Sequence, residues 1–192
     1  MTEHEDEVIE GQIRDEKLDP EREARRRLAL AQIRQWPDAA LRMQARPVEE
    51  FDDDLRSLVE RMKLLMRDAN GIGLAATQVG ILRRVFVFQP EEDEVIAVVN
   101  PEIVERSDET DVADEGCLSI QGVTVPVERS VEVTIVGTDE NGNDLRLDLD
   151  GYAARCVQHE ADHLDGVLML DRTTPDARRE ALGFLRPRVA LS

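Results

Sequence analysis

Residues 158–163 read QHEADH and contain the pattern H-E-x-x-H. This pattern restricts the possible structure and function of the chain more than any other segment. Helical residues four apart share one face, so the imidazoles of His159 and His163 can bind one divalent ion. Glu160 leaves the helix in another direction but can reach a water on that ion and take its proton. The alternative is a surface helix that carries two histidines by chance. Only three histidines occur, and the third, His4, lies in an acidic N-terminal stretch, so the pattern favours a metal-dependent hydrolase.

A third ligand is needed, because catalytic sites of this kind usually hold their ion with three side chains and keep one position open. The two cysteines are the candidates. Cys156 lies three residues before His159, a spacing that makes joint ligation with both histidines awkward, and a small buried residue is the simpler interpretation. Cys117 lies in a glycine-containing segment between predicted strands, and its thiolate suits a borderline metal. We therefore expect Cys117 in the ligand set.

Length and composition describe a globular chain with an unusual charge. Its 192 residues suffice for one domain with a core. No run approaches about 18 apolar residues, and the N-terminus lacks the features of a secretory signal, so we expect no membrane association and a cytoplasmic location. The formal net charge of −18 opposes binding to nucleic acid. Solubility or a salt-tolerant proteome explains this charge most simply, and a basic partner is the alternative.

The apolar pattern predicts both helices and strands. Helices are expected at residues 21–35, 52–69 and 152–164 and after Thr174. Strands are expected at 84–88 and 95–99, bounded by Pro90 and Pro101, and at 167–170. Residues 130–150 predict a hairpin that turns at Asn141-Gly142. This order predicts an α+β fold, a single compact domain with mixed or antiparallel strands around a central metal-binding helix.

Three segments, in this order, resemble peptide deformylase: residues 71–78 (GIGLAATQ), 115–119 (EGCLS) and 158–163 (QHEADH). Each motif alone is modestly specific, whereas all three at these separations are very specific. The resemblance extends from about Trp36 to Thr174. It implies a metal-dependent hydrolase that removes the formyl group from the N-terminal formylmethionine of nascent polypeptides and releases formate.

The resemblance also implies the metal chemistry. Cys117, His159 and His163 would bind one divalent metal ion per chain, and Glu160 would act as general base and later as proton donor. Relatives are typically ferrous enzymes, so Fe2+ is expected. Zn2+, Ni2+ or Co2+ can substitute, because imidazole and thiolate suit several metals.

Substrate contacts follow from the same resemblance. Gln78 and the backbone N–H of Leu118 would stabilise the charge that grows on the formyl oxygen. Ile72, Gly73 and Gly116 would hold an N-formylmethionyl peptide in extended form, as in strand addition.

The ends of the chain and one loop depart from the family pattern. Residues 1–35 predict an acidic extension, partly disordered or helical, before a catalytic domain at 36–186 and a tail at 187–192. Relatives dock on the ribosome through a longer C-terminal helix, so the short, mildly basic C-terminus here gives only limited support for a transient ribosome contact. Gln121 stands where proline is common in the family, in a loop that borders the cleft.

Two other classes of protein compete with this interpretation. A zinc endopeptidase of the H-E-x-x-H type needs a third ligand downstream, but no histidine follows His163, and Asp165 and Asp171 are the nearby acids. A non-catalytic metal-binding protein on the same scaffold is expected to have lost Glu160, Gln78 or Cys117, and all three are present.

Overall fold

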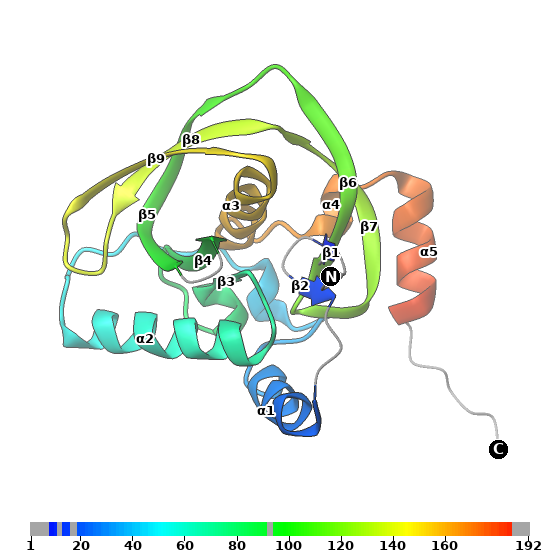
Figure 1. Cartoon of the computed structure of the whole chain (residues 1–192), viewed down its shortest axis with the longest axis horizontal. Coiled ribbons are helices and arrows are strands. Elements are labelled where there is room, and N and C mark those ends of the chain that lie inside the picture. Colours follow the sequence, from blue (N-terminus) through cyan, green and yellow to red (C-terminus); the bar gives the residue numbers. More distant parts are fainter. Residues whose placement is uncertain (1–7, 11–12, 16–18, 92–93, 186–192) are drawn as a thin grey trace, which may run out of the picture.

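A curved five-stranded antiparallel sheet forms the largest layer of the computed structural model (Figure 1), which describes residues 8–10, 13–15, 19–91 and 94–185. Its strands, in spatial order, are β3 (Gly73–Ala75), β4 (Val85–Glu91), β5 (Glu94–Arg106), β8 (Glu132–Thr138) and β9 (Asp144–Asp150). Two separate hairpins join β6 (Thr110–Cys117) with β7 (Ile120–Ser130), and β1 (Val8–Glu10) with β2 (Ile13–Asp15). Since all these pairs are antiparallel, the predicted strand arrangement is confirmed.

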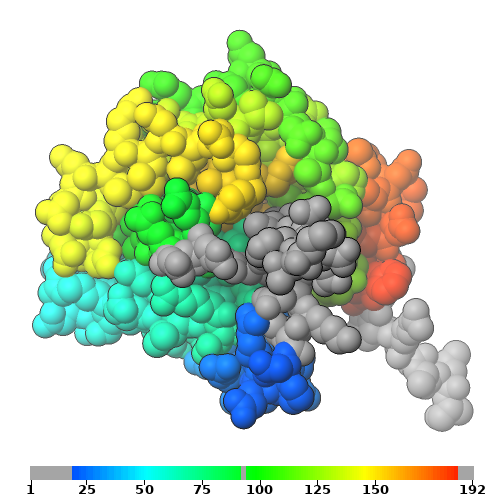
Figure 2. Space-filling model, viewed as in Figure 1, coloured from blue at the N-terminus to red at the C-terminus, as the bar shows by residue number. Residues whose placement is uncertain are grey.

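One helix lies inside the curve of the strands, and the others lie below it or to its right (Figure 1). The helices are α1 (Pro20–Leu30), α2 (Asp53–Asp68), the central α3 (Gly151–Leu164), the single turn α4 (Met169–Arg172) and α5 (Pro175–Leu185), with short 3-10 turns η1 (Ala39–Arg42) and η2 (Ala76–Val79). In the space-filling view α2 runs below the β8–β9 hairpin, and α5 forms the opposite flank (Figure 2). The predicted α+β fold around a central helix is confirmed.

An apolar cluster holds α3 against the sheet. Ala154, Cys156 and Val157 of α3 are buried together with Phe86 and Ile135 of the facing strands. The edges of Phe86 and Phe88 meet in a T-shaped arrangement with centroids 5.9 Å apart. Burying aromatic side chains of this size is among the strongest packing contributions available to a small domain, so the helix with the H-E-x-x-H pattern is rigidly placed.

Helix α2 forms where the periodicity predicts it. The carboxylate of Asp52 accepts the N–H of Leu55 at 2.9 Å and caps the first turn. Met62 and Met66 are fully buried in the cluster between α2 and the sheet, so they are core residues.

The β8–β9 hairpin also forms as predicted, but two strands run further than expected. Thr138 pairs with Asp144 across a loop of residues 139–143, and Gly142 in this loop has φ of 85°, which glycine adopts without strain. Pro90 and Pro101 were expected to end their strands, yet β4 and β5 contain them. The register shifts between Phe88 and Glu91 and between Val99 and Glu102, and such irregular pairing tolerates a residue without an N–H.

The strand expected at 167–170 is wrong, because Met169 begins the helical turn α4. The Asp171 carboxylate accepts the N–H of Leu168 at 2.9 Å, so a local cap favours the turn. Leu168, Met169 and Leu170 are buried in one cluster with Cys117 and Ile120, and periodicity cannot separate a strand from a helix in so short a segment.

The first helix also ends early, at Leu30 rather than near residue 35. The N–H of Arg34 donates to the Gln78 carbonyl at 2.7 Å, and that of Trp36 to the Ser119 carbonyl at 2.8 Å. Because these donors bind distant loops, they cannot continue the helix.

Part of the predicted N-terminal extension (residues 1–7, 11–12 and 16–18) and the tail at 187–192 lie outside the described residues. Among the helices that the structure describes, none is long and apolar enough to cross a membrane.

Candidate active site

The two histidines lie on the inner face of α3. Both are 1% exposed, their Nε2 atoms are 3.2 Å apart, and their ring centroids are 4.9 Å apart. Two glycines with positive φ bound this helix: Gly151 at its start (51°) and Gly166 just after its end (71°). A Cβ on Gly166 would stand 2.6 Å from the Arg42 carbonyl oxygen, so only glycine allows the chain to turn there.

Cys117 joins the histidines from another part of the chain. It is the last residue of β6, is fully buried, and its Sγ lies 3.4 Å from His163 Nε2. The ligand atoms of Cys117, His159 and His163 all lie within 4.8 Å of one another. One thiolate and two imidazoles on a buried, converging triangle suit a borderline divalent metal, so the residues fit the expected ion.

Cys156, the second cysteine, lies in α3 itself and is not part of this triangle. Cys156 is 1% exposed, and its Sγ lies 3.5 Å from the Ile72 carbonyl oxygen, to which the thiol donates. Burial, with the nearby charges of Glu160 and Glu115, raises the pKa of Cys156 well above its ordinary value. A neutral thiol is a poor metal ligand, which agrees with its interpretation as a small buried residue.

A buried carboxylate lies behind His159. Glu115 is fully buried and its Oε2 is 2.9 Å from His159 Nδ1. Arg129 donates to both oxygens of Glu115, at 2.9 and 3.0 Å, and Arg155 donates to Oε1 at 3.0 Å. Arg129 also reaches Asp162 at 2.6 Å, which binds Arg172 in turn. This buried network fixes the ring of His159 through Nδ1, and its other nitrogen, Nε2, lies close to His163 and would be the one to bind a metal.

The network separates the charge states of the two histidines. Burial alone disfavours a charged imidazole, but hydrogen bonds with Cys117 and Glu115 raise the pKa of His159 to about 10. Burial and the positive charge of His159 lower the pKa of His163 well below its ordinary value. Burial alone raises the pKa of Glu115, but hydrogen bonds from His159 and Arg129 hold it well below its usual range. His163 Nδ1 has no hydrogen-bond partner among the described residues, so only one of the two ligands is held by a carboxylate.

Gln78 approaches the triangle from η2. Its Oε1 accepts the N–H of Ala75 at 2.8 Å, and its Nε2 donates to Ser119 Oγ at 3.0 Å. The same Nε2 lies 3.7 Å from Cys117 Sγ. Since each end of the amide has a partner of the right kind, the donor end faces the ligand set.

Leu118 and Gly116 flank Cys117. Leu118 is buried in the tight turn between β6 and β7, where Cys117 pairs with Ile120. Gly116 is a buried residue of β6, at the register shift between Glu115 and Cys117.

Gly73 lets an edge strand come close to Glu160. A Cβ at Gly73 would collide with Glu160 Oε1 and stand 2.8 Å from Cys156 Sγ. Among the described strands, β3 pairs only with β4, so its other edge faces away from the sheet. The carbonyl of Ile72 accepts the N–H of Gln89 at 2.8 Å as well as the Cys156 thiol, so this carbonyl is already used within the fold.

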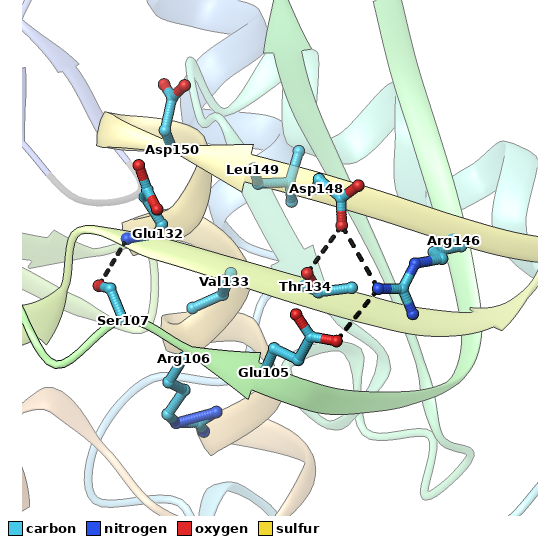
Figure 3. A pocket seen from close by; sticks show the side chains of 10 residues that line it. All are labelled: Glu105, Arg106, Ser107, Glu132, Val133, Thr134, Arg146, Asp148, Leu149 and Asp150. Atoms are coloured by element: carbon cyan, nitrogen blue, oxygen red, sulfur yellow. Dashed lines mark hydrogen bonds and ion pairs between the residues drawn. The ribbon is translucent and has the colours of Figure 1, made fainter.

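A hollow elsewhere on the surface is the alternative candidate for the active site. It has a volume of about 540 Å³ and lies on the outer side of β5, β8 and β9 (Figure 3). Its acids are exposed, and Glu105 and Asp148 share the cation Arg146. A shallow surface of solvated ion pairs lacks the buried, converging donors of the triangle, so we assign the site to the triangle.

Sequence reasoning missed the residues behind the ligands. Glu115 begins the second segment that resembles the family, Asp162 stands within H-E-x-x-H itself, and Arg129 lies between the second and third segments. No local signal distinguished them, because Asp114 precedes Glu115 and Glu128 precedes Arg129. Such residues are buried only when they are paired.

A buried Cys-His-His triangle beside a glutamate on the same helix defines a metal-dependent hydrolase. Residues 30–179 match the family model described as polypeptide deformylase. A peptide deformylase of Thermotoga maritima is 47% identical over 146 residues, 76% of this chain and 88% of that protein. Peptide deformylase 1 of Corynebacterium glutamicum is 42% identical over 162 residues, 83% of this chain and 96% of that protein.

Solved structures agree with these sequence relatives. The crystal structure of the Thermotoga maritima peptide deformylase has a TM-score of 0.72 at 46% identity and covers 74% of this chain and 97% of that one. A peptide deformylase from Synechococcus elongatus in complex with actinonin has a TM-score of 0.76 at 41% identity and covers 79% and 85%. The chain belongs to the polypeptide deformylase family. It is a metal-dependent enzyme that removes the N-terminal formyl group of N-formylmethionyl polypeptides.

Proposed function

We propose that Cys117, His159 and His163 hold one Fe2+ ion in this deformylase and that Glu160 is its general base. The convergence of three buried ligand atoms within 4.8 Å carries the proposal. When bound, the ion supplies Lewis-acid chemistry at the formyl group. Glu160, which is fully buried next to His159, takes a proton from the attacking water and later gives it to the departing amine.

Gln78 and Leu118 stabilise the negative charge on the formyl oxygen. The amide of Gln78 is held at both ends, so little reorganisation is needed when charge develops. The N–H of Leu118 adds a second donor from the loop that carries Cys117. Removing one such donor typically raises the barrier by about 3–4 kcal/mol.

The substrate peptide adds to the free edge of β3. The backbone of Gly73 and the N–H of Ile72 provide its hydrogen bonds on one side, and Gly116 on β6 provides them on the other. The absence of a side chain at Gly73 keeps this edge close to Glu160. An extended formylmethionyl peptide is thus brought to the base and the ligand set together.

Ribosome contact through the C-terminus and the division at residues 35 and 186 stay predictions. Arg178 lies 3.6 Å from Asp171, and Arg179 lies 2.8 Å from Asp176, so these cations of α5 are already paired with acids. Arg186 and Arg188 lie outside the described residues.

Replacing the base tests the proposal. We expect Glu160→Gln, purified without oxygen, to keep stoichiometric iron but to release formate from a formyl-Met tripeptide at least about 100-fold more slowly. Glu105→Gln, at an exposed position, is the matched control and is expected to behave as wild type. Undiminished formate release by Glu160→Gln would exclude Glu160 as the base. Cleavage of an unblocked internal peptide without formate release would favour the endopeptidase alternative.

A further inference from the structure

Gln35 reaches from the segment after α1 to the loop that carries Cys117. Its Nε2 donates to the Leu118 carbonyl oxygen at 3.0 Å. The adjacent N–H of Trp36 donates to the Ser119 carbonyl at 2.8 Å. Two successive carbonyls of this loop are therefore held by Gln35 and Trp36, which are adjacent to each other but far from the loop in the sequence.

The bond from Gln35 fixes one peptide group that also faces the metal ligand. The carbonyl of Leu118 and the N–H of Ser119 belong to the same trans peptide, so they point in opposite directions. The Ser119 N–H donates to Cys117 Sγ at 3.4 Å. Gln35 on the carbonyl side thus sets the direction in which this N–H meets the sulfur.

Gln121 determines which end of the Gln35 amide faces Leu118. Its Nε2 donates to Gln35 Oε1 at 2.9 Å. With its oxygen occupied by a donor, Gln35 presents its NH2 group to the carbonyl. A residue without a side-chain donor at position 121 would leave this Gln35 oxygen without the bond from Gln121 and would not fix the orientation of the amide.

We propose that Gln35, oriented by Gln121, is a positioning residue that acts on Cys117 through the Leu118–Ser119 peptide. The inference rests on the proposed role of Cys117 as a metal ligand. A hydrogen bond to a ligating sulfur withdraws electron density from it, and partners behind the ligands tune metal affinity and electronic structure. The other role open to Gln35 is a simple tie between two loops, which would leave the sulfur unaffected.

An isosteric change separates these two roles. In Gln35→Glu the carboxylate has no N–H for the Leu118 carbonyl and repels it, whereas Gln121 can still donate to it. With cobalt(II) as the probe, we expect the thiolate-to-metal absorption band to move to lower energy. We also expect the cobalt dissociation constant to rise about threefold to tenfold, the effect of one hydrogen bond. Gln121→Ala, a change at an exposed residue, should shift both readouts in the same direction by less.

Gln32→Glu is the matched control, because it makes the same charge change at an exposed residue three positions away. If folded Gln35→Glu and Gln121→Ala share the band position and cobalt affinity of Gln32→Glu, the proposal is overturned and Gln35 is a structural tie. Formate release by the wild-type protein is measured separately. Its failure would overturn the proposed function while the spectroscopic comparison still decides the role of Gln35.

Discussion

Two groups of arginines and acids on this molecule differ mainly in their access to water. Behind the metal ligands, Arg129 and Glu115 are 6% and 0% exposed and 2.9 Å apart. In the surface hollow, Arg146 and Glu105 are 54% and 68% exposed and 3.3 Å apart (Figure 3). The chemistry and distances are similar, so the comparison isolates the effect of burial.

Burial changes what each charge requires. A desolvated charge must be paired and hydrogen-bonded, whereas an exposed one is already stabilised by water. Glu115 therefore has three cationic or imidazole partners, namely Arg129, Arg155 and His159. In the buried group the loss of one member removes a partner that water cannot replace, whereas in the exposed group water takes its place.

The largest expected effect comes from Glu115→Gln. Removing the charge takes away the buried carboxylate that Arg129 and Arg155 share and leaves Asp162 to balance Arg129. Breaking such a buried pair typically costs about 3–5 kcal/mol of unfolding free energy. His159 also loses its carboxylate partner, so metal affinity should fall by about 10- to 100-fold. Urea unfolding of the metal-free protein and competition with a chelator measure the two effects.

Glu105→Gln provides the comparison in the hollow. It should change the unfolding free energy by no more than about 0.5 kcal/mol and leave metal binding alone. Equal losses of stability in the two variants would show that burial does not separate the groups.

The buried group should also make the stability of the protein depend on pH. The folded pKa of Glu115 lies well below its ordinary value of 4.5, so its stabilisation is present above that value and is lost as the pH falls. The pKa of His159, raised from 6.5 to about 10, gives the opposite sign. Its stabilisation is complete below 6.5 and is lost as the pH rises through about 10. The unfolding free energy of the metal-free protein should thus decline on both sides of this window.

Glu115→Gln should flatten this profile on its acid side, since the titrating carboxylate is gone. Urea unfolding at a series of pH values in the presence of a chelator measures both profiles. Parallel curves for wild type and Glu115→Gln would mean that Glu115 does not link pH to folding.

The features that the sequence could predict are those that depend on local patterns. His159, Glu160 and His163 follow from a fixed spacing on one helix, and the β8–β9 hairpin follows from alternation around Asn141-Gly142. These are local patterns, and the structure contains the helix and the hairpin. The β6–β7 hairpin, which brings Cys117 to the histidines, has a weaker pattern because both strands carry charged residues on exposed faces.

Contacts between distant segments could not be predicted in this way. Whether Gln35 continues a helix or binds the Leu118 carbonyl depends on a loop 83 residues away. Glu115 looks like an ordinary acidic residue until the fold removes water from it and supplies Arg129 and Arg155. Tertiary context decides such cases, because local propensity says nothing about which groups lose their solvent.

The smallest expected effect is the coupling between Arg146 and Glu105. Their distance of 3.3 Å satisfies the geometry of an ion pair, but both side chains are more than half exposed. Solvent screening offsets most of the attraction, and holding two long side chains together costs entropy, so a double-mutant cycle with Arg146→Ala and Glu105→Ala should give less than about 0.5 kcal/mol. High salt should remove even that amount. A salt-resistant coupling above about 1 kcal/mol would contradict this expectation. The hollow would then contain an ordered network in which Asp148, 3.8 Å from Arg146, takes part, and exposure alone would no longer distinguish the two groups.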